Sequence, residues 1–525
     1  MKKNKPIYSE TTLFWGAGAT AELGAPTTVQ TAKSLHKLAD TENLLIALKD
    51  SDLFNDIEKP LSEFLENLEE NKTYKNIYDW EALKGILEKI PFDELNPSLY
   101  LQDIYNVIDG NLLSKQGFMV IDENKENMFL NYIRLQKARN TLGMLNQCMF
   151  VCAYHNKSIK KPQKIKQYAD FAETLGILMQ EEGDRLSGFP VDKPQFYLES
   201  CAHISTNYDP VLQYIFFQAN KKLNDNPPCI GKSNRELKLF LDYSVLLGLK
   251  QQDGAVRYSV DESVLHRLNP EQHGKKVIRI GKYFLPHGCI NFRECENCGK
   301  VTAIFGNQWS EMAKDLYNPL PFKNDLPQYK DPDEDRDDDK DGYKDGIKCP
   351  YCENTTLLHN APTIYQTSYK GSHTAFLEEI QRNTKTCLVG TKHIVLMGYQ
   401  LPPDDVVWRS AIMSKINKDD KNKKYCSVVV GSKGEDRWIE GGELRNWVNA
   451  KKEQVPYKDW SDYGIHAIDS ASAIFGKDCV RAYTGGIPNV YLSNGVADRL
   501  KIEDLLYPKN VFPTGIHSIA EMRKG

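Results

Sequence analysis

The fold of this chain is decided by the stretch TTLFWGAGAT, which runs from Thr11 to Thr20. Its first half, Thr11–Trp15, is rich in β-branched and aromatic residues, which is typical of a short buried strand. Glycines follow directly at positions 16 and 18, where they allow a tight turn and a close approach of the backbone to another group. The stretch therefore predicts a strand, a glycine turn and a helix that begins near Thr20.

The glycine turn has two interpretations. In one, its backbone amides bind the phosphates of a dinucleotide at the start of the following helix, and the binding residues are Gly16, Ala17, Gly18, Ala19 and Thr20. In the other, it is a tight connection that binds nothing. The third glycine of the usual GxGxxG spacing is displaced to Gly24, so the turn alone does not decide between them.

Four more short apolar runs end in a glycine, an asparagine or a histidine. They are Ala202–Thr206 before Asn207, Lys282–Pro286 before His287, His393–Met397 before Gly398, and Tyr425–Val430 before Gly431. Strands that end in such residues are typical of a parallel sheet whose ligands bind at its carboxyl ends. The pattern predicts an α/β fold with a Rossmann-like parallel sheet.

Residues 31–198 have a different hydrophobic pattern, with apolar positions three and four apart, as in amphipathic helices. The clearest segments are Leu44–Leu48, Leu61–Leu68, Trp80–Ile90, Met128–Tyr154 and Tyr168–Met179. We therefore expect an inserted helical domain over residues 31–198, within an α/β unit formed by residues 1–30 and 199–525. A zinc-binding insertion is expected over residues 290–375 of that unit.

Asn207 and Asp209 lie in one segment but invite different interpretations. Asp209 stands before Pro210 and predicts an N-cap, with the proline in the first position of a helix over Val211–Gln218. Asn207 falls at the strand end, where its amide can hold a water molecule or a ribose hydroxyl. A plain turn residue is the alternative for Asn207.

His287 differs from the other ten histidines because it combines a strand end with a following glycine. General bases are often placed at this position in open α/β sheets. A buried histidine whose ring is satisfied by a neighbouring group is the alternative. We take His287 as the candidate base.

Two CxxC pairs follow His287, and they consist of Cys295, Cys298, Cys349 and Cys352. Paired thiolates at this spacing are typical of tetrahedral Zn²⁺ sites. The segment between the pairs contains the acidic run Asp331–Asp345, which predicts a solvated loop. Because four thiolates leave no open coordination position, we expect a structural zinc ion.

The composition excludes several classes of protein. A length of 525 residues implies more than one packed unit, and a net charge of −4 argues against a nucleic-acid binder with a general basic field. No apolar run approaches the length of a membrane span, and the Lys-rich N-terminus lacks the apolar core of a secretory signal. The twelve cysteines do not form the dense framework of a small secreted protein. We expect a cytoplasmic protein without direct nucleic-acid or membrane binding.

The order of these motifs is more specific than any one of them. The glycine turn, the TNYD segment at 206–209, His287-Gly288, the two CxxC pairs and the strand before Gly398 follow one another along the chain. This order resembles the NAD-binding domain of the sirtuin family, without the helical segment. The resemblance implies that NAD is bound by the glycine turn and Asp209, with Gly398 and Gly431 beside its adenosine half. Asn207 and His287 would be the catalytic residues.

The departures from the sirtuin pattern also carry information. Sirtuin deacylases have Asp-Phe-Arg where this chain has Thr27, Thr28 and Val29, and Gln where it has Thr206. Their Gly-Thr-Ser segment is replaced by residues 398–405, and their peptide-pairing Phe-Gly-Glu segment has no counterpart. These changes resemble the sirtuin-like effectors of bacterial antiphage systems, which hydrolyse NAD instead of deacylating protein.

The resemblance implies an NAD hydrolase that releases nicotinamide and ADP-ribose. An NAD-dependent protein deacylase and a non-catalytic nucleotide-sensing module are the alternatives. Because unrestrained NAD hydrolysis would harm the cell that contains it, we expect control through the helical insertion, through a homo-oligomer, or through a partner protein such as an ATPase.

Overall fold

The computed structural model describes most of the chain. The described residues are 9–39, 78–121, 126–185, 201–226, 237–243, 248–250, 256–258, 277–304, 347–356, 363, 374–414 and 423–515, except 24, 95, 161, 296, 350, 403, 404 and 432. Three sequence predictions lie outside them, namely the helices at Leu44–Leu48 and Leu61–Leu68 and the acidic loop at Asp331–Asp345.

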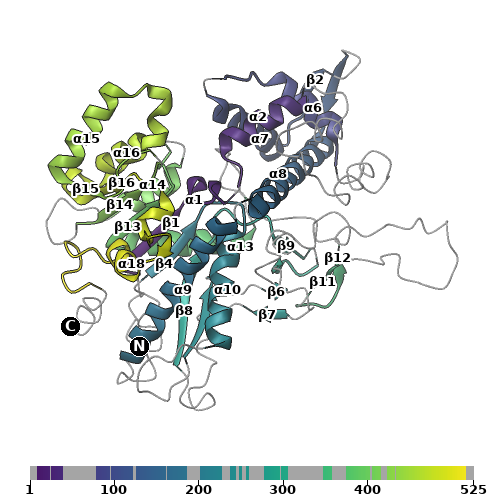
Figure 1. Ribbon diagram of the computed structural model, residues 1–525. Coiled ribbons are helices and arrows are strands. Elements are labelled where there is room, and N and C mark those ends of the chain that lie inside the picture. The colour runs from purple at the N-terminus through teal and green to yellow at the C-terminus, as the bar shows by residue number, and fades with distance from the viewer. Residues whose placement is uncertain are drawn as a thin grey trace.

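An eight-stranded sheet forms the centre of the structure (Figure 1). Its strands lie in the order β15-β16-β14-β13-β1-β4-β8-β5. Neighbours from β16 to β5 are parallel, whereas β15 runs antiparallel at one edge. The bounds are β1 (Thr11–Trp15), β4 (Cys201–Ser205), β5 (Leu237–Asp242), β8 (Val277–Phe284), β13 (His393–Met397), β14 (Tyr425–Val429), β15 (Trp438–Glu440) and β16 (Val480–Tyr483). The predicted α/β fold with a largely parallel sheet is confirmed.

The sequence located the strands of this sheet closely. β1 and β13 have the predicted bounds, and both are buried along their whole length, as central parallel strands are. β8 begins earlier than predicted because it pairs with β5 from Val277 onward. β16 lies inside the sheet beside β14.

The direction of strand order reverses between β1 and β13. From β1 the chain moves outward through β4, whereas β13, β14 and β16 extend the sheet on the other side. Trp15 is in register with both Ser205 and Met397, so the carboxyl ends of the three strands lie level. Open α/β sheets bind ligands in the crevice at such a reversal.

Helices cover both faces of the sheet, which gives three layers (Figure 1). Leu13 and Trp15 of β1 point into one hydrophobic cluster and Phe14 into the other, as the two-residue period of a strand requires. The first face carries α9 (Pro162–Arg185), α10 (Val211–Asp225), α17 (Ile487–Tyr491) and α18 (Arg499–Leu506). The second carries α13 (Ala375–Gly390), α14 (Val406–Met413), α15 (Gly441–Gln454) and α16 (Ile465–Phe475), with short 3-10 helices at Tyr457–Tyr463 and Lys477–Cys479.

A third hydrophobic cluster lies apart from the sheet, at the upper right of Figure 1. It is built from α2 (Thr28–Ala39), α6 (Trp80–Lys89), α7 (Pro97–Ser114), α8 (Tyr132–Lys160) and the hairpin β2–β3 (Phe118–Ile121 and Asn127–Leu130). The helix predicted to start at Met128 starts at Tyr132, because residues 127–130 pair with β2 instead. The predicted helical segment Tyr168–Met179 belongs to α9, whose buried side chains share the cluster of the sheet.

Small sheets complete the structure. β9 (Phe292–Glu294) and β10 (Val301–Ile304) join β6 (Gly248–Lys250) and β7 (Val256–Tyr258), so this sheet takes strands from outside residues 290–375. Two further hairpins are β11–β12 (Ile347–Lys348 and Thr355–Thr356) and β17–β18 (Leu492–Ser493 and Val496–Ala497).

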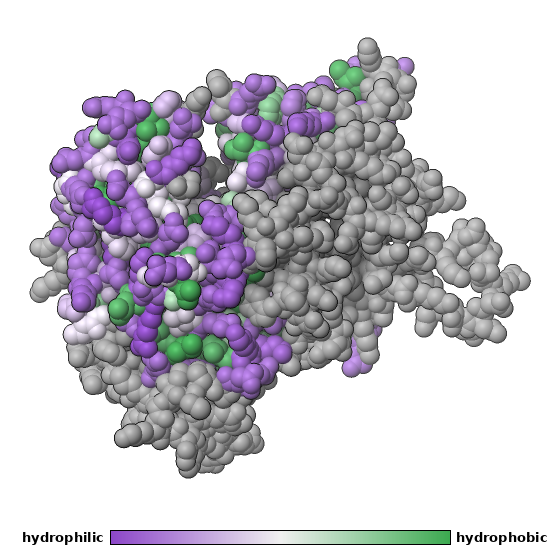
Figure 2. All heavy atoms as spheres, in the orientation of Figure 1, coloured by the Kyte–Doolittle hydropathy of each residue, from purple (hydrophilic) through white to green (hydrophobic). Residues whose placement is uncertain are grey.

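Hydrophilic side chains cover most of the described face in Figure 2, and the hydrophobic residues on it form small separate patches. Such scattered apolar residues are normal for a protein surface. Among the described helices, none combines the length and the hydrophobicity that a membrane span requires.

Candidate functional site

Three motifs that are far apart in the sequence meet at the carboxyl edge of the sheet. The Asn207 side chain, after β4, donates a hydrogen bond from Nδ2 to the carbonyl oxygen of Gly16, after β1, at 3.0 Å. His287, after β8, places Nδ1 3.2 Å from the carbonyl oxygen of Thr206. The two candidate catalytic residues therefore belong to one hydrogen-bonded group that also includes the glycine turn.

The glycine turn packs directly against the end of β13. A Cβ atom on Gly16 would lie 2.7 Å from the carbonyl oxygen of Gly398, and one on Gly398 would lie 2.3 Å from the backbone nitrogen of Ala19. Gly398 also has a φ of +62°, which favours glycine. The glycines at these positions are therefore explained by the close approach of two backbones.

The amides of the turn are largely engaged within the protein. Gly16 N donates to Met397 O at 2.9 Å, and Gly18 N donates to Gly398 O at 3.1 Å. Helix α1 (Ala17–Ala21) is a single short turn in which Ala17 and Gly18 are exposed. A dinucleotide would thus meet this turn at those two residues, and phosphate binding there stays a prediction.

Asn207, Thr20 and Asp209 form a buried polar network behind the turn. Asn207 Nδ2 donates to Thr20 Oγ1 at 3.2 Å, and the Thr20 hydroxyl donates to Asp209 Oδ2 at 2.9 Å. Burial raises the pKa of the Asp209 carboxyl to about 6, although the hydrogen bond from Thr20 lowers it. The network fixes the Asn207 amide, because the Gly16 carbonyl can only accept a hydrogen bond.

This network determines what Asn207 can offer to a ligand. Its nitrogen donates to two groups of the protein, while no described residue donates to its Oδ1. The side chain is 5% exposed, so contact with a ligand is confined to a small area. Asn207 is therefore oriented as a hydrogen-bond acceptor, which suits a hydroxyl or a water molecule.

Asp209 caps its helix in a different way from the prediction. The N-cap of α10 is Pro210 itself, not Asp209. Asp209 Oδ1 nevertheless accepts a hydrogen bond from the backbone nitrogen of Val211 at 3.1 Å, and so it satisfies one of the free amides of the first turn.

His287 is buried, at 5% exposed, and is held between two aromatic side chains. The indole nitrogen of Trp408 donates a hydrogen bond to His287 Nε2 at 3.1 Å. The ring of Tyr208 stacks on the imidazole with centroids 6.1 Å apart. The segment after His287 also contacts Tyr208, because Ile290 N donates a hydrogen bond to Tyr208 O at 2.9 Å.

Trp408 is a site residue that the sequence did not reveal. It lies on α14, which follows the loop after Gly398, and it is 1% exposed. A tryptophan on a short apolar helix usually packs in a core, and Trp408 does so as well. Only the fold brings its indole nitrogen to His287, across 121 positions of the sequence.

Gly431 lies at the end of β14, the neighbour of β13. Its φ is +76°, and a Cβ there would lie 2.5 Å from the carbonyl oxygen of Asp462. Packing against the 3-10 helix before α16 thus accounts for this glycine. The predicted contact with adenosine is not tested by this geometry.

The four predicted cysteines come together in one cluster. Their sulfur atoms all lie within 4.8 Å of one another, with Cys295–Cys352 and Cys298–Cys349 both at 3.7 Å. Two similar turns hold them, because Gly299 N donates to Cys295 O and Glu353 N donates to Cys349 O. The cluster could hold a metal ion such as zinc, which four sulfur ligands in this arrangement suit.

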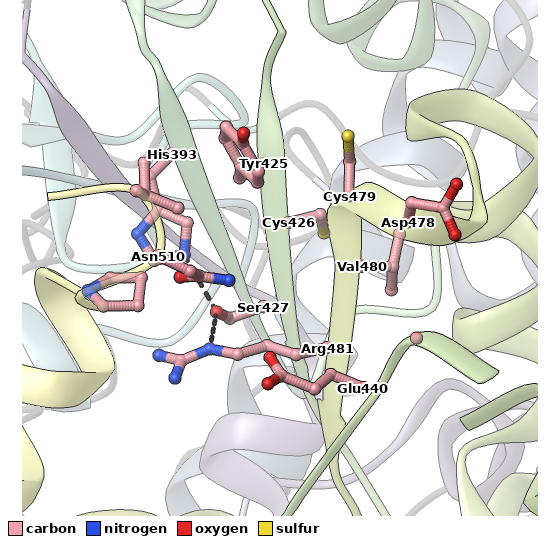
Figure 3. Close-up of a pocket in the computed structure, with 13 residues that line it drawn as sticks. His393, Tyr425, Cys426, Ser427, Glu440, Asp478, Cys479, Val480, Arg481 and Asn510 are labelled. Atoms are coloured by element: carbon pink, nitrogen blue, oxygen red, sulfur yellow. Dashed lines mark hydrogen bonds between the residues drawn. The ribbon is translucent and has the colours of Figure 1, made fainter. Parts of the chain in front are cut away.

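A separate cavity of about 280 Å³ lies at the opposite, amino edge of the sheet (Figure 3). Ser427 stands at its centre, 2.8 Å from both Arg481 Nε and His393 Nε2. Arg481 also pairs with Asp504 of α18 at 3.0 Å and lies over the Trp438 ring. These contacts join β13, β14, β15 and β16 to α18, and no pattern in the sequence predicts them.

No protein-family model matches the chain, and no curated protein matches it at a significant level. The geometry of the site therefore carries the functional argument.

Proposed function

We propose that the protein is an NAD hydrolase that cleaves the bond between nicotinamide and ribose. The observation that carries this proposal is the convergence of Asn207, His287 and the glycine turn at the reversal of strand order. Crevices of this kind in Rossmann-like sheets bind dinucleotides. The order of motifs that resembles sirtuins supports NAD as the dinucleotide.

Nicotinamide leaves readily in this reaction. The glycosidic bond breaks with its electron pair moving to the nicotinamide nitrogen, which neutralises the pyridinium charge. A water oxygen then bonds to the same ribose carbon and gives up a proton, so NAD⁺ and water yield ADP-ribose, nicotinamide and H⁺. Catalysis thus requires a positioned water and a group that takes its proton.

Asn207 and His287 are suited to these two tasks. The Oδ1 atom of Asn207 can accept a hydrogen bond from the water or from a ribose hydroxyl, since its nitrogen is already engaged. His287 Nε2 is the basic nitrogen of the ring, because Nδ1 faces a carbonyl oxygen. A positioned base typically accelerates such a step by about 10²–10⁴-fold.

The decisive test is incubation of the purified chain with NAD alone. Release of nicotinamide and ADP-ribose is expected without any acyl-peptide. Release that requires an acetyl-lysine peptide would replace this proposal with a protein deacylase. Binding of NAD without turnover, with and without the peptide, would favour a nucleotide-sensing module.

Two substitutions test whether the reaction takes place at Asn207 and His287. Asn207→Ala and His287→Gln should each lower turnover by about 10²-fold or more, whereas His466→Ala on α16 should leave it unchanged. Unaltered turnover in both site variants would place the chemistry elsewhere. Circular dichroism and thermal unfolding check that each variant is folded.

The proposal extends to a structural Zn²⁺ on the four cysteines and to a biological role. A hydrolase that depletes NAD suits an antiphage effector, whose activity must be restrained until infection. We therefore propose control by self-association or by a partner protein such as an ATPase. Turnover measured across protein concentrations, with the oligomeric state recorded, separates the two.

A further inference from the structure

The hydrogen bond between Trp408 and His287 fixes the protonation of the imidazole. An indole nitrogen can only donate, so His287 Nε2 must be the acceptor at 3.1 Å. The ring proton then resides on Nδ1, which faces the Thr206 carbonyl oxygen at 3.2 Å. Both contacts agree on one neutral tautomer.

The same bond opposes the use of His287 as a base. A proton that arrives on Nε2 would point at the indole N–H, and two donors cannot share a hydrogen bond. Both side chains are nearly inaccessible, with Trp408 at 1% and His287 at 5% exposed. Water therefore cannot simply replace the lost partner, and a buried donor without a partner is destabilising.

Helix α14 is held in place by its own N-terminal contacts. The Tyr399 hydroxyl donates to Asp405 Oδ2 at 2.5 Å, and Arg409 Nη1 donates to the Leu401 carbonyl oxygen at 2.9 Å. Val406 and Met413, near its two ends, are 64% and 54% exposed. The helix thus carries a buried tryptophan on one side and an unprotected apolar surface on the other.

We propose that Trp408 is the positioning residue of the site, which holds His287 as the neutral Nδ1–H tautomer and must release Nε2 before His287 can accept a proton. The catalytic half of this statement rests on the proposed function. In the resting protein the lone pair of the base is occupied, and release of Trp408 with α14 makes it available. NAD turnover is therefore coupled to the position of α14.

The elements packed around His287 each carry titratable groups. Tyr208 and Asp209 follow β4, Tyr399 and Asp405 precede α14, and Glu378 and Arg382 lie on α13, which also contacts the Pro286 carbonyl through Gln381. Trp408→Phe substitutes none of these groups, although it removes part of the ring together with the indole N–H. A change in the tautomer of His287 on this substitution is thus assigned to the lost hydrogen bond.

The test compares Trp408→Phe with Trp447→Phe in the full-length chain. Both changes remove an indole N–H and keep an aromatic ring, but Trp447 Nε1 makes no hydrogen bond with any described residue. NMR of ¹³C- and ¹⁵N-labelled histidine reports the tautomer and pKa of His287 directly. We expect Trp408→Phe to raise that pKa by about half to one unit, equivalent to one hydrogen bond, and Trp447→Phe to leave it unchanged.

An unchanged pKa and tautomer of His287 in Trp408→Phe would overturn the proposal, whatever the enzymatic activity. If the pKa shifts but no variant hydrolyses NAD, the positioning role stands and the proposed function fails. If NAD is hydrolysed, the acidic limb of the profile of kcat/KM against pH, which reports the free enzyme, should move by the same amount in Trp408→Phe.

A second measurement needs no variant at position 408. In the wild-type chain, the indole N–H resonance of Trp408 should move upfield as the pH falls through the pKa of His287, because the bond breaks on protonation. An indole resonance that does not change through the titration of His287 would contradict the proposal.

Discussion

Gly16 and Gly398 touch where the strand order of the sheet reverses. The carbonyl oxygen of Gly398 would lie 2.7 Å from a Cβ on Gly16 and 2.9 Å from one on Gly18. Two turns from opposite halves of the sheet therefore meet backbone to backbone. In the view of Figure 2, a hollow lies close to the place where Figure 1 draws α1.

This contact predicts that Gly398→Ala is strongly destabilising. The new methyl group would lie 2.3 Å from Ala19 N at a φ of +62°, and both partners are backbone. Gly441→Ala is the matched control, since its φ is +57° and nothing lies within 4 Å of the new Cβ. We expect a loss of about 1 kcal/mol for the control and about 3 kcal/mol or more for Gly398→Ala. Equal losses in urea unfolding would show that the turns can move apart.

Asp209 predicts a specific dependence of stability on pH. Burial raises its pKa from 3.8 to about 6, so between these values the folded chain binds more protons than the unfolded chain. The contribution of this carboxyl to stability is therefore full below pH 3.8 and is lost as the pH rises through 6. A shift of about two pKa units corresponds to about 3 kcal/mol of unfolding free energy.

Asp209→Asn should remove that dependence. Its Oδ1 can still accept from Val211 N, whereas its Nδ2 cannot accept from Thr20 and must instead donate to that hydroxyl. The loss in unfolding free energy from acidic to neutral pH should be smaller in the variant by about 2–3 kcal/mol. Asp225→Asn, at the exposed end of α10, serves as the control. Parallel pH curves for Asp209→Asn and the wild type would contradict the assignment.

The cysteine cluster predicts about one zinc ion per chain. Burial raises the pKa of Cys298 to about 12, and the Asn297 amide lowers that of Cys352 to about 6, so binding of the metal must displace protons. Cys349→Ser should abolish the bound zinc in elemental analysis and lower the thermal stability. The Cys479→Ser variant, changed at a cysteine outside the cluster, should retain the zinc. If wild-type protein purified in the presence of zinc contained no bound metal, the site would be ruled out.

The pair Arg481–Asp504 predicts that α18 is anchored to the sheet by one charge. Asp504 supplies both a carboxylate and a carbonyl oxygen to the buried guanidinium. Asp504→Ala should cost about 2 kcal/mol of unfolding free energy, the range for hydrogen bonds to charged groups. Glu503→Ala, on the same helix, breaks only an exposed pair with Arg499 and should cost about 0.5 kcal/mol or less. Similar losses would show that the Asp504 carboxylate is not the anchor.

Much of the fold was predictable because it depends on local sequence. Runs such as Thr11–Trp15 and His393–Met397 are apolar over the length of one strand and are followed at once by glycine, so their type and bounds were evident. The cysteine cluster was predictable for a similar reason, since the spacing within each CxxC pair already sets the geometry of two ligands.

The contacts of the site were not predictable in this way. The sequence placed Asn207 and His287 at strand ends, and the parallel sheet brings those ends together. It could not show that the Gly16 carbonyl accepts from the Asn207 amide or that the Gly18 amide donates to Gly398. Nor could it show that Asp209 accepts from Thr20 as well as from its own helix. These partners are nearly 200 residues or more apart, and hydrogen bonds over such separations leave no periodic signal.

The sequence by itself determined the strands, the glycine turn, the cysteine pairs and the candidates Asn207 and His287, because strand length, turn chemistry and ligand spacing are local properties. Only the tertiary structure decided the order of the strands, the backbone contact between Gly16 and Gly398, and the bond from Trp408 to His287. The reason is physical: an indole nitrogen finds an imidazole only after two separate segments have packed into the same core.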